Sequence, residues 1–191
     1  MQRLAVLISL ASLTACTSND FVDAAAQVEG IYRVTTYTRN EQACVPGGAS
    51  LLTKETFAFA ATQQVLGLAV LDVFSCDDPA DCRDKLAKLG TGGAFGLDFG
   101  FSVSDVQKGV MLGEGASTGF AEGGTCTGGE VTRTRLVVEG TTLRLQQEVT
   151  AADDYPADAD GFCTSDAAKA AARGNACSAL EVLTAELIEP L

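Results

Sequence analysis

Strand-type alternation is the feature that most constrains the fold of this chain. Residues 95–103, FGLDFGFSV, carry apolar side chains at every odd position and Gly, Asp or Ser at every even one. A period of two sustained over such a stretch predicts a strand with one buried face. Residues 30–40 (GIYRVTTYTRN) are also strand-like, and TFAFAA places Phe57 and Phe59 on one face. Residues 65–76 are nearly all apolar, which predicts a strand buried on both faces or a barrel wall.

The second half of the chain predicts a hairpin and a final strand. Residues 136–149, LVVEGTTLRLQQEV, read as strand, turn and strand, with Gly140 at the first turn position, where a type II′ turn needs a positive φ. The tail 178–188 has two interpretations. Ser178 and Glu181 have the spacing of a helix capping box, but a last strand is favoured because a disulfide would return the chain to the sheet.

Two short helices are predicted between the strands. Asp78 before Pro79 has the pattern of an N-cap followed by a proline at the first helical position, and Gly90 would end that helix. The second runs from Thr164 or Ser165 to Gly174. Residues 28–191 are therefore predicted to form a single disulfide-stapled, mostly β domain. Its fold class is an antiparallel up-and-down barrel or barrel-like sandwich with two short helices and three disulfides.

The first residues have the pattern of an export signal. A positive start at Arg3 precedes the apolar run 4–13, which falls short of the roughly 20 residues that cross a bilayer. Leu13-Thr14-Ala15-Cys16 resembles the lipobox of bacterial lipoproteins. The resemblance implies that residues 1–15 are a signal peptide, that Cys16 receives a diacylglyceryl group, and that cleavage precedes Cys16. Ordinary secretory cleavage after Ala15 is the alternative.

The lipoprotein resemblance also implies a location and a tether. Thr17 in the second mature position favours sorting to the outer membrane, by analogy with enteric bacteria. Residues 16–27 are polar and Ala-rich and are predicted to be the lipidated N-terminus and a tether. The predicted partner is thus the membrane itself, held through acyl chains, two of which anchor stably where one does not.

Six of the seven cysteines remain after Cys16 is assigned to the anchor. An even number in an exported chain predicts three disulfides, because that compartment is oxidising. Zinc binding is the alternative, but the spacings fit no zinc pattern and the chain has no histidine. Sequence proximity favours the disulfides Cys76–Cys82 and Cys163–Cys177. The two remaining cysteines would then form Cys44–Cys126.

Charge and composition exclude several functions. The net charge is −12, or −12 − 1 = −13 once Arg3 is removed, and no basic cluster occurs. Because Lys and Arg supply most affinity for nucleic acid, no nucleic-acid partner is predicted. The absence of histidine removes Ser-His-Asp and Cys-His catalysis. No cofactor is predicted, and GGTCTGG at 123–129 lacks the Lys of a phosphate-binding loop.

The pattern of strands over residues 28–188 resembles lipocalin-like (calycin) barrels, with VEGIYRVTTYTRN in the place of their first strand. The resemblance implies an up-and-down barrel with a lumen for a small apolar ligand. The Gly-x-Trp of that family is absent and the chain has no tryptophan, so no ligand residue is carried over. From the sequence itself, five phenylalanines could line a lumen or be ordinary core: Phe57, Phe59, Phe95, Phe99 and Phe101.

One acidic loop is a candidate for calcium. DDYPADADGFCTSD gathers several aspartates, of which Asp158 and Asp160 precede Gly161. An EF-hand register places Pro156 and Ala167 at ligand positions, so a solvated acidic loop is the preferred interpretation and no metal is assigned.

Three functions remain open from the sequence. The preferred one is a membrane-anchored extracytoplasmic lipoprotein with a non-enzymatic binding or envelope-interaction role, its partner an unknown protein or ligand. The second is a lipocalin-like carrier of a small apolar ligand. The third, a carboxylate-based hydrolase, would need two inward-facing carboxylates in one cleft.

Overall fold

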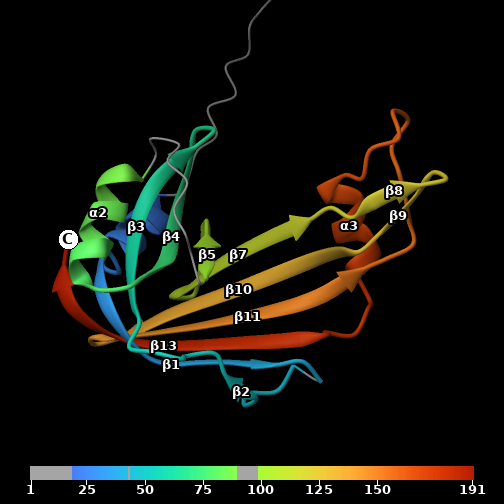
Figure 1. Ribbon diagram of the computed structural model, residues 1–191. Coiled ribbons are helices and arrows are strands. Elements are labelled where there is room, and N and C mark those ends of the chain that lie inside the picture. The colour runs from blue at the N-terminus through green and yellow to red at the C-terminus, as the bar shows by residue number, and fades with distance from the viewer. Residues whose placement is uncertain (1–18, 43, 90–98) are drawn as a thin grey trace, which may run out of the picture.

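The protein folds as an antiparallel, nearly closed β-barrel that extends on one side into a second lobe (Figure 1). The computed structural model describes residues 19–42, 44–89 and 99–191. The strands of the barrel follow one another around it in chain order, as predicted for an up-and-down fold. They are β1 (Gly30–Asn40), β3 (Phe57–Val65), β4 (Leu68–Cys76), β5 (Gly100–Val103), β6 (Asp105–Gln107), β7 (Val110–Ser117), β10 (Gly129–Glu139), β11 (Thr142–Ala152) and β13 (Ala179–Pro190).

One short segment joins the two edges of the sheet. β5 pairs with β4, β6 pairs with β7, and only Ser104 separates β5 from β6. A Cβ on Gly113 would lie 2.0 Å from the carbonyl oxygen of Ser102, so this glycine is what lets β5 lie against β7. The last strand, β13, pairs with β1 over most of its length. The two-residue strand β2 (Ala49–Ser50) adds to the edge of β1.

The inner face of the barrel holds the main core. Helix α1 (Asn19–Ala26) packs across one end of it, where the side chains of Phe21 and Ala25 are fully buried. The tether predicted for residues 16–27 is therefore wrong from Asn19 onward, because Phe21, Ala25 and Val28 recur at helical spacing and bury one face. No helix among the described residues has the length and apolar character that spanning a bilayer requires.

Helix α2 (Pro79–Lys88) covers the outer face of β3 and β4. The side chain of Asp78 caps it by accepting hydrogen bonds from the backbone N–H groups of Ala80 and Asp81, which confirms the predicted N-cap and the proline at the first position. Gly90, predicted to stop this helix, lies outside the described residues. Beneath α2 lies a second core of buried residues: Ile31, Phe57, Phe59, Ala61, Cys76 and Cys82.

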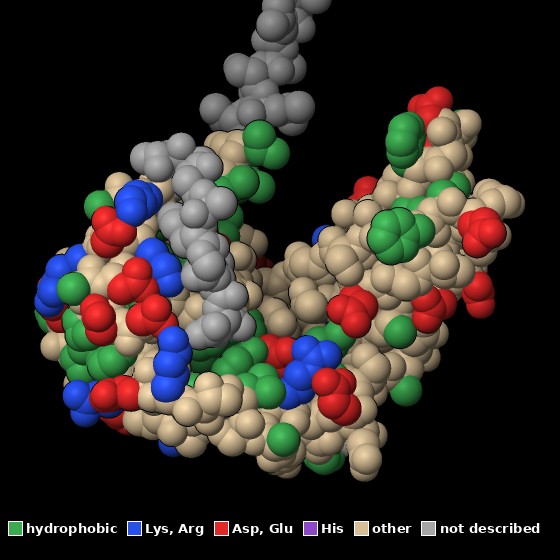
Figure 2. All heavy atoms as spheres, viewed as in Figure 1, with side chains coloured by type: hydrophobic (Ala, Val, Ile, Leu, Met, Phe, Trp, Pro, Cys, Tyr) green, Lys and Arg blue, Asp and Glu red, His purple; other side chains and the backbone are tan. Residues whose placement is uncertain are grey.

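The second lobe is built on the far ends of β10 and β11. Helix α3 (Ser165–Ala172) starts at Ser165 as predicted, is capped by Thr164, and packs there with a small sheet. The strands of that sheet are β8 (Phe120–Glu122), β9 (Thr125–Thr127) and β12 (Tyr155–Pro156). Figure 2 shows the molecule hollowed between this lobe and the lobe that carries β3, β4 and α2.

Only one of the three predicted disulfides is correct. Cys76–Cys82 is present, but Cys44 pairs with Cys177 and Cys126 with Cys163. Pairing of β1 with β13 brings the two segments of Cys44 and Cys177 together, since Asn40 lies opposite Leu180. The prediction weighed distance along the chain and could not include this contact between the first and last strands.

Three local predictions on turns and strands have different outcomes. Gly140 has φ +63° at the β10–β11 turn, and residues 179–190 are a strand, both as predicted. Residues 65–76 are not one strand, because Leu66 and Gly67 form the turn between β3 and β4 with φ of +51° and +82°. An apolar run conceals a turn when the turn residues are themselves apolar.

Candidate functional site

A pocket of about 540 Å³ lies at the end of the barrel opposite α1. Tyr37 reaches it from the last residues of β1, and Phe99 from the residue before β5. Barrel mouths are common places for small-molecule sites, and this volume lies within the range of known ligand pockets. The lining residues are Tyr37, Leu51, Leu52, Thr53, Lys54, Thr56 and Phe99.

Aromatic rings form the inner wall of this mouth pocket. The ring centroids of Tyr37 and Phe99 lie 5.0 Å apart in an edge-to-face arrangement, and Phe101 stands edge-on to Tyr37 at 6.2 Å. Such contacts hold rings in place beyond what burial alone provides. The pocket therefore has an aromatic inner wall, and polar atoms supply the larger part of its exposed lining.

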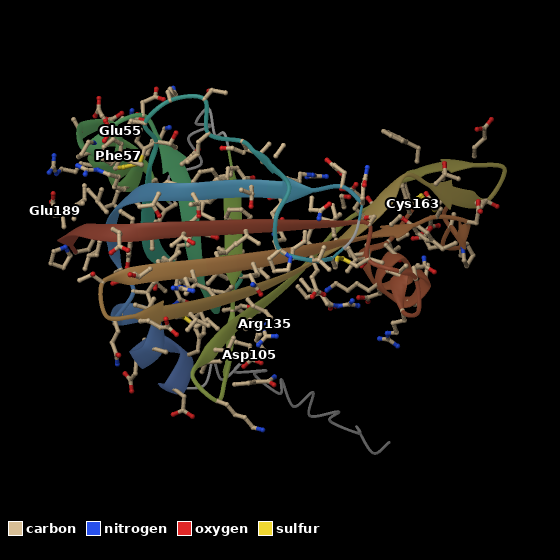
Figure 3. All side chains as sticks on the ribbon, turned by 90° about the horizontal axis from the view of Figure 1, so that it is seen from below. Glu55, Phe57, Asp105, Arg135, Cys163 and Glu189 are labelled. Atoms are coloured by element: carbon tan, nitrogen blue, oxygen red, sulfur yellow. A yellow bond between two sulfur atoms is a disulfide. The ribbon has the colours of Figure 1, made fainter. Side chains whose placement is uncertain are left out.

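The lumen behind the mouth is packed with side chains. Phe101 faces it and is buried, as are residues from every long strand of the barrel. The phenylalanines that were predicted to line a lumen do not all face it. Phe57 and Phe59 lie on the outer face of β3 beneath α2. Figure 3 shows Phe57 beside Glu55 at the α2 side of the molecule, with the Arg33 guanidinium 6.0 Å from the centre of its ring. Phe95 lies outside the described residues.

A buried carboxylate supports Tyr37 from behind. The hydroxyl of Tyr37 donates to Oε2 of Glu181 at 2.9 Å, and Nη1 of Arg39 donates to Oε1 at 2.5 Å. Glu181 is only 7% exposed, so both of its oxygens need these partners. Burial, together with the neighbouring Glu181 charge, raises the pKa of Tyr37, which keeps its hydroxyl a donor at any physiological pH.

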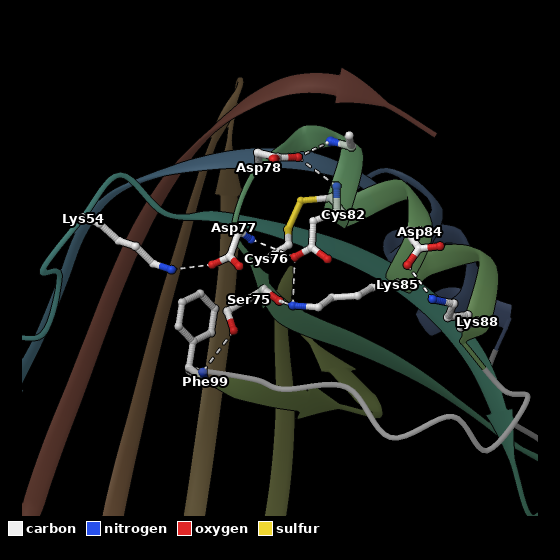
Figure 4. Close-up of polar contacts among 12 residues, drawn as sticks. Lys54, Ser75, Cys76, Asp77, Asp78, Cys82, Asp84, Lys85, Lys88 and Phe99 are labelled. Atoms are coloured by element: carbon white, nitrogen blue, oxygen red, sulfur yellow. Dashed lines mark hydrogen bonds and ion pairs between the residues drawn. A yellow bond between two sulfur atoms is a disulfide. The ribbon is translucent and has the colours of Figure 1, made fainter.

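The outer wall of the mouth pocket is tied to the start of α2 (Figure 4). The backbone N–H of Phe99 donates to Oγ of Ser75 at 3.3 Å, and the N–H of Ser75 donates to the carbonyl of Phe99 at 3.2 Å. The ammonium of Lys54 contacts Oδ1 of Asp77 at 2.5 Å. The Cys76–Cys82 disulfide fixes the chain immediately after Ser75. Two lining residues, Phe99 and Lys54, are thus linked to the residues just before α2.

A second pocket of about 330 Å³ lies beside β5, lined by backbone and by Ser102, Thr132, Thr134 and Gln147 among others. Asp72, 2% exposed, lies behind Ser102. The Ser102 hydroxyl donates to its Oδ1 at 2.5 Å, and the amide of Gln63 donates to Oδ2. Burial raises the pKa of Asp72, and these two hydrogen bonds counteract only part of that effect.

Replacing Asp72 with asparagine is expected to stabilise the protein at pH 7. A raised folded-state pKa means that stability is lost as pH rises above the ordinary carboxyl value of about 4, because the folded chain resists ionisation. Asparagine removes that cost. The melting temperature of Asp72→Asn should exceed that of the parent at pH 7, with the gap closing towards pH 3.5. The exposed Asp160→Asn serves as control, and a variant less stable than the parent at pH 7 would contradict the assignment.

The calcium candidates Asp158 and Asp160 line neither of these two pockets. Asp158 Oδ1 accepts the backbone N–H groups of Asp160 and Phe162, so its carboxylate organises its own loop. No group of three or more possible metal ligands occurs within the described residues. Glu114 borders the second pocket, and its carboxylate pairs with Arg133 at 3.3 Å and Lys169 at 3.5 Å. Cys16 lies outside the described residues.

Tyr37 and Glu181 are the site residues that the sequence analysis missed. Strict alternation from Tyr32 and Val34 would turn Tyr37 to the outside. A register shift between Val34 and Thr36 changes the phase of β1 and turns Tyr37 inward. No residue type in this stretch indicates the bulge beforehand. Glu181 was interpreted only as part of a capping box.

Comparisons with known proteins return nothing for this chain: no family model, no curated protein and no solved structure matches it.

Proposed function

We propose that this protein is a lipid-anchored extracytoplasmic binding protein that takes a small ligand with both apolar and polar groups at the mouth of its barrel, without catalysing a reaction. The observation that carries the binding role is the mouth pocket, whose aromatic wall is rigidly held and whose base is closed by the packed lumen. The anchor rests on the lipobox-like sequence ending at Cys16.

The chemistry of the pocket defines the ligand class. Leu51, Leu52 and Phe99 present apolar surface, whereas Thr53 and Lys54 lie on the same wall as polar groups. The fitting ligand is a small amphipathic molecule, with an apolar part that meets the leucines and Phe99 and polar groups that meet Thr53 and Lys54. This proposal differs from the lipocalin-like carrier, whose ligand lies inside the barrel. Here the ligand would bind at the mouth, above the packed lumen.

Two substitutions separate the anchor from the pocket. In Cys16→Ser the acyl mass should be lost and the protein should leave the membrane fraction. In Phe99→Ala the acyl mass should remain, and retention of the bound small molecule should fall about tenfold, the equivalent of roughly 1.4 kcal/mol of lost contact. Native mass spectrometry of protein purified from its own membrane measures both.

Phe120→Ala is the matched control, because Phe120 is 85% exposed on the other lobe and should change neither mass. A Cys16→Ser protein that stays acylated and membrane-bound would refute the anchor. A ligand retained equally by the parent and Phe99→Ala would refute the mouth pocket.

A further inference from the structure

The turn between β3 and β4 exposes apolar side chains. Leu66 at its tip is 99% exposed, and its neighbours Val65 and Leu68 are 43% and 45% exposed. Scattered exposed apolar residues are normal in proteins. Three in four consecutive positions at the end of a projecting hairpin form a localised apolar tip.

The hairpin also lacks charge. From Thr56 to Leu71 there is no Asp, Glu, Lys or Arg, although charged residues make up 20% of the chain and about three would be expected in such a stretch. The neighbouring β6–β7 turn has the same backbone form, with φ of +52° and +79°, but places Lys108 at the equivalent position. An apolar residue at this point is therefore not required by the turn.

Leu66 is an unfavourable residue for the conformation that it adopts. Two successive positive φ values are those of a type I′ turn, which favours Asn-Gly, Asp-Gly or Gly-Gly. A leucine there loses free energy to backbone strain and gains none from burial. Strain kept at an exposed position is a reason to look for a function that the side chain performs outside the folded domain.

The hairpin lies at the end of the barrel that α1 covers, because α1 contacts both β3 and β4. Oε1 of Glu29, just after α1, accepts the backbone N–H of Thr62 at 2.9 Å. Leu66 is four residues beyond Thr62, or about 13 Å along an extended strand. Cys16 precedes the first residue of α1 by three positions, which a chain spans in at most about 11 Å.

We propose that the Val65–Leu68 tip inserts into the interfacial layer of the bilayer that holds the acylated Cys16. This inference rests on the lipid anchor of the proposed function. The anchor would bring the tip close to lipid, and burial of Leu66 in the acyl region would recover the apolar energy that the fold leaves unused. The net charge of the cleaved chain, −12 − 1 = −13, repels anionic lipid, so the partner surface is zwitterionic.

The absence of tryptophan makes a direct test possible. Leu66→Trp introduces a single fluorophore at a position where the fold makes no demand on side-chain packing. Full-length acylated protein is purified in detergent and reconstituted into phosphatidylcholine vesicles, with or without brominated acyl chains. Emission from Leu66→Trp should shift to shorter wavelength in vesicles, and bromolipid should quench it at least twofold. Phe120→Trp, on the other lobe, should remain unquenched.

The mass of the same preparation shows whether the protein is acylated, and so tests the lipid anchor separately from the insertion of the tip. Acylated protein with an unquenched Leu66→Trp signal would overturn the insertion and leave the anchor intact. Protein without acyl mass but with a quenched signal would refute the anchor and support insertion by the hairpin alone. Equal quenching of Leu66→Trp and Phe120→Trp would overturn the insertion, because it would show that the whole domain lies on the lipid.

Discussion

Replacing both Cys44 and Cys177 with serine is expected to lower the free energy of unfolding by about 5 kcal/mol, the largest loss of any disulfide in this protein. The bridge closes a loop with a sequence separation of 133, and in the chain-entropy model the stabilisation grows with the logarithm of the loop length. The bridge joins the segment after β1 to the segment before β13, the first and last strands of the barrel. Equilibrium denaturation in urea measures the effect.

The matched control is removal of Cys76 and Cys82, which closes a loop with a separation of only 6. The same model gives about 2 kcal/mol for it. Non-reducing peptide mapping of the parent should recover Cys44 linked to Cys177 and Cys126 linked to Cys163. Recovery of Cys163 joined to Cys177 would contradict the pairing, as would equal losses in the two double variants.

The secondary structure was predictable where one residue type has one structural use. Asp78 and Pro79 start α2 because a capping carboxylate and a ring without an N–H suit only a helix N-terminus. Gly140 adopts the positive φ of its turn, and the alternating residues of β11 turn Leu143 and Leu145 into the core. These are local effects, so the sequence alone carries them.

The arrangement of faces was less predictable, because in this barrel both faces of the β3–β4 wall are buried. Phe59 and Phe101 are each part of an alternating apolar stripe, yet one stripe meets α2 and the other the lumen. Alternation tells which residues share a face but not which face is inside. The bulge that turns Tyr37 inward, and the contact between the first and last strands, depend on register and closure, which are set by the whole sheet.

Truncation of Phe59 to alanine is expected to cost about 3–5 kcal/mol of stability while leaving ligand retention unchanged. The side chain is fully buried under α2, with its ring centroid 5.7 Å from that of Phe74, so its removal leaves a cavity in the outer core. The mouth pocket lies on the other face of the wall and keeps Tyr37 and Phe99. Urea denaturation and native mass spectrometry of the same sample measure the two properties.

Phe99→Ala, unlike Phe59→Ala, should lose ligand, because the Phe99 ring lines the mouth pocket. The free energy of unfolding of Phe120→Ala should stay within about 0.5 kcal/mol of the parent, because Phe120 is exposed. Loss of ligand in Phe59→Ala at a small stability cost would place Phe59 in a lumen, as the alternation alone allowed. A large loss of stability with the ligand retained would show that the two apolar stripes have different roles. The outer stripe, with Phe59, would pack α2 against the barrel. The inner stripe, with Phe101, would end at the pocket that binds the ligand.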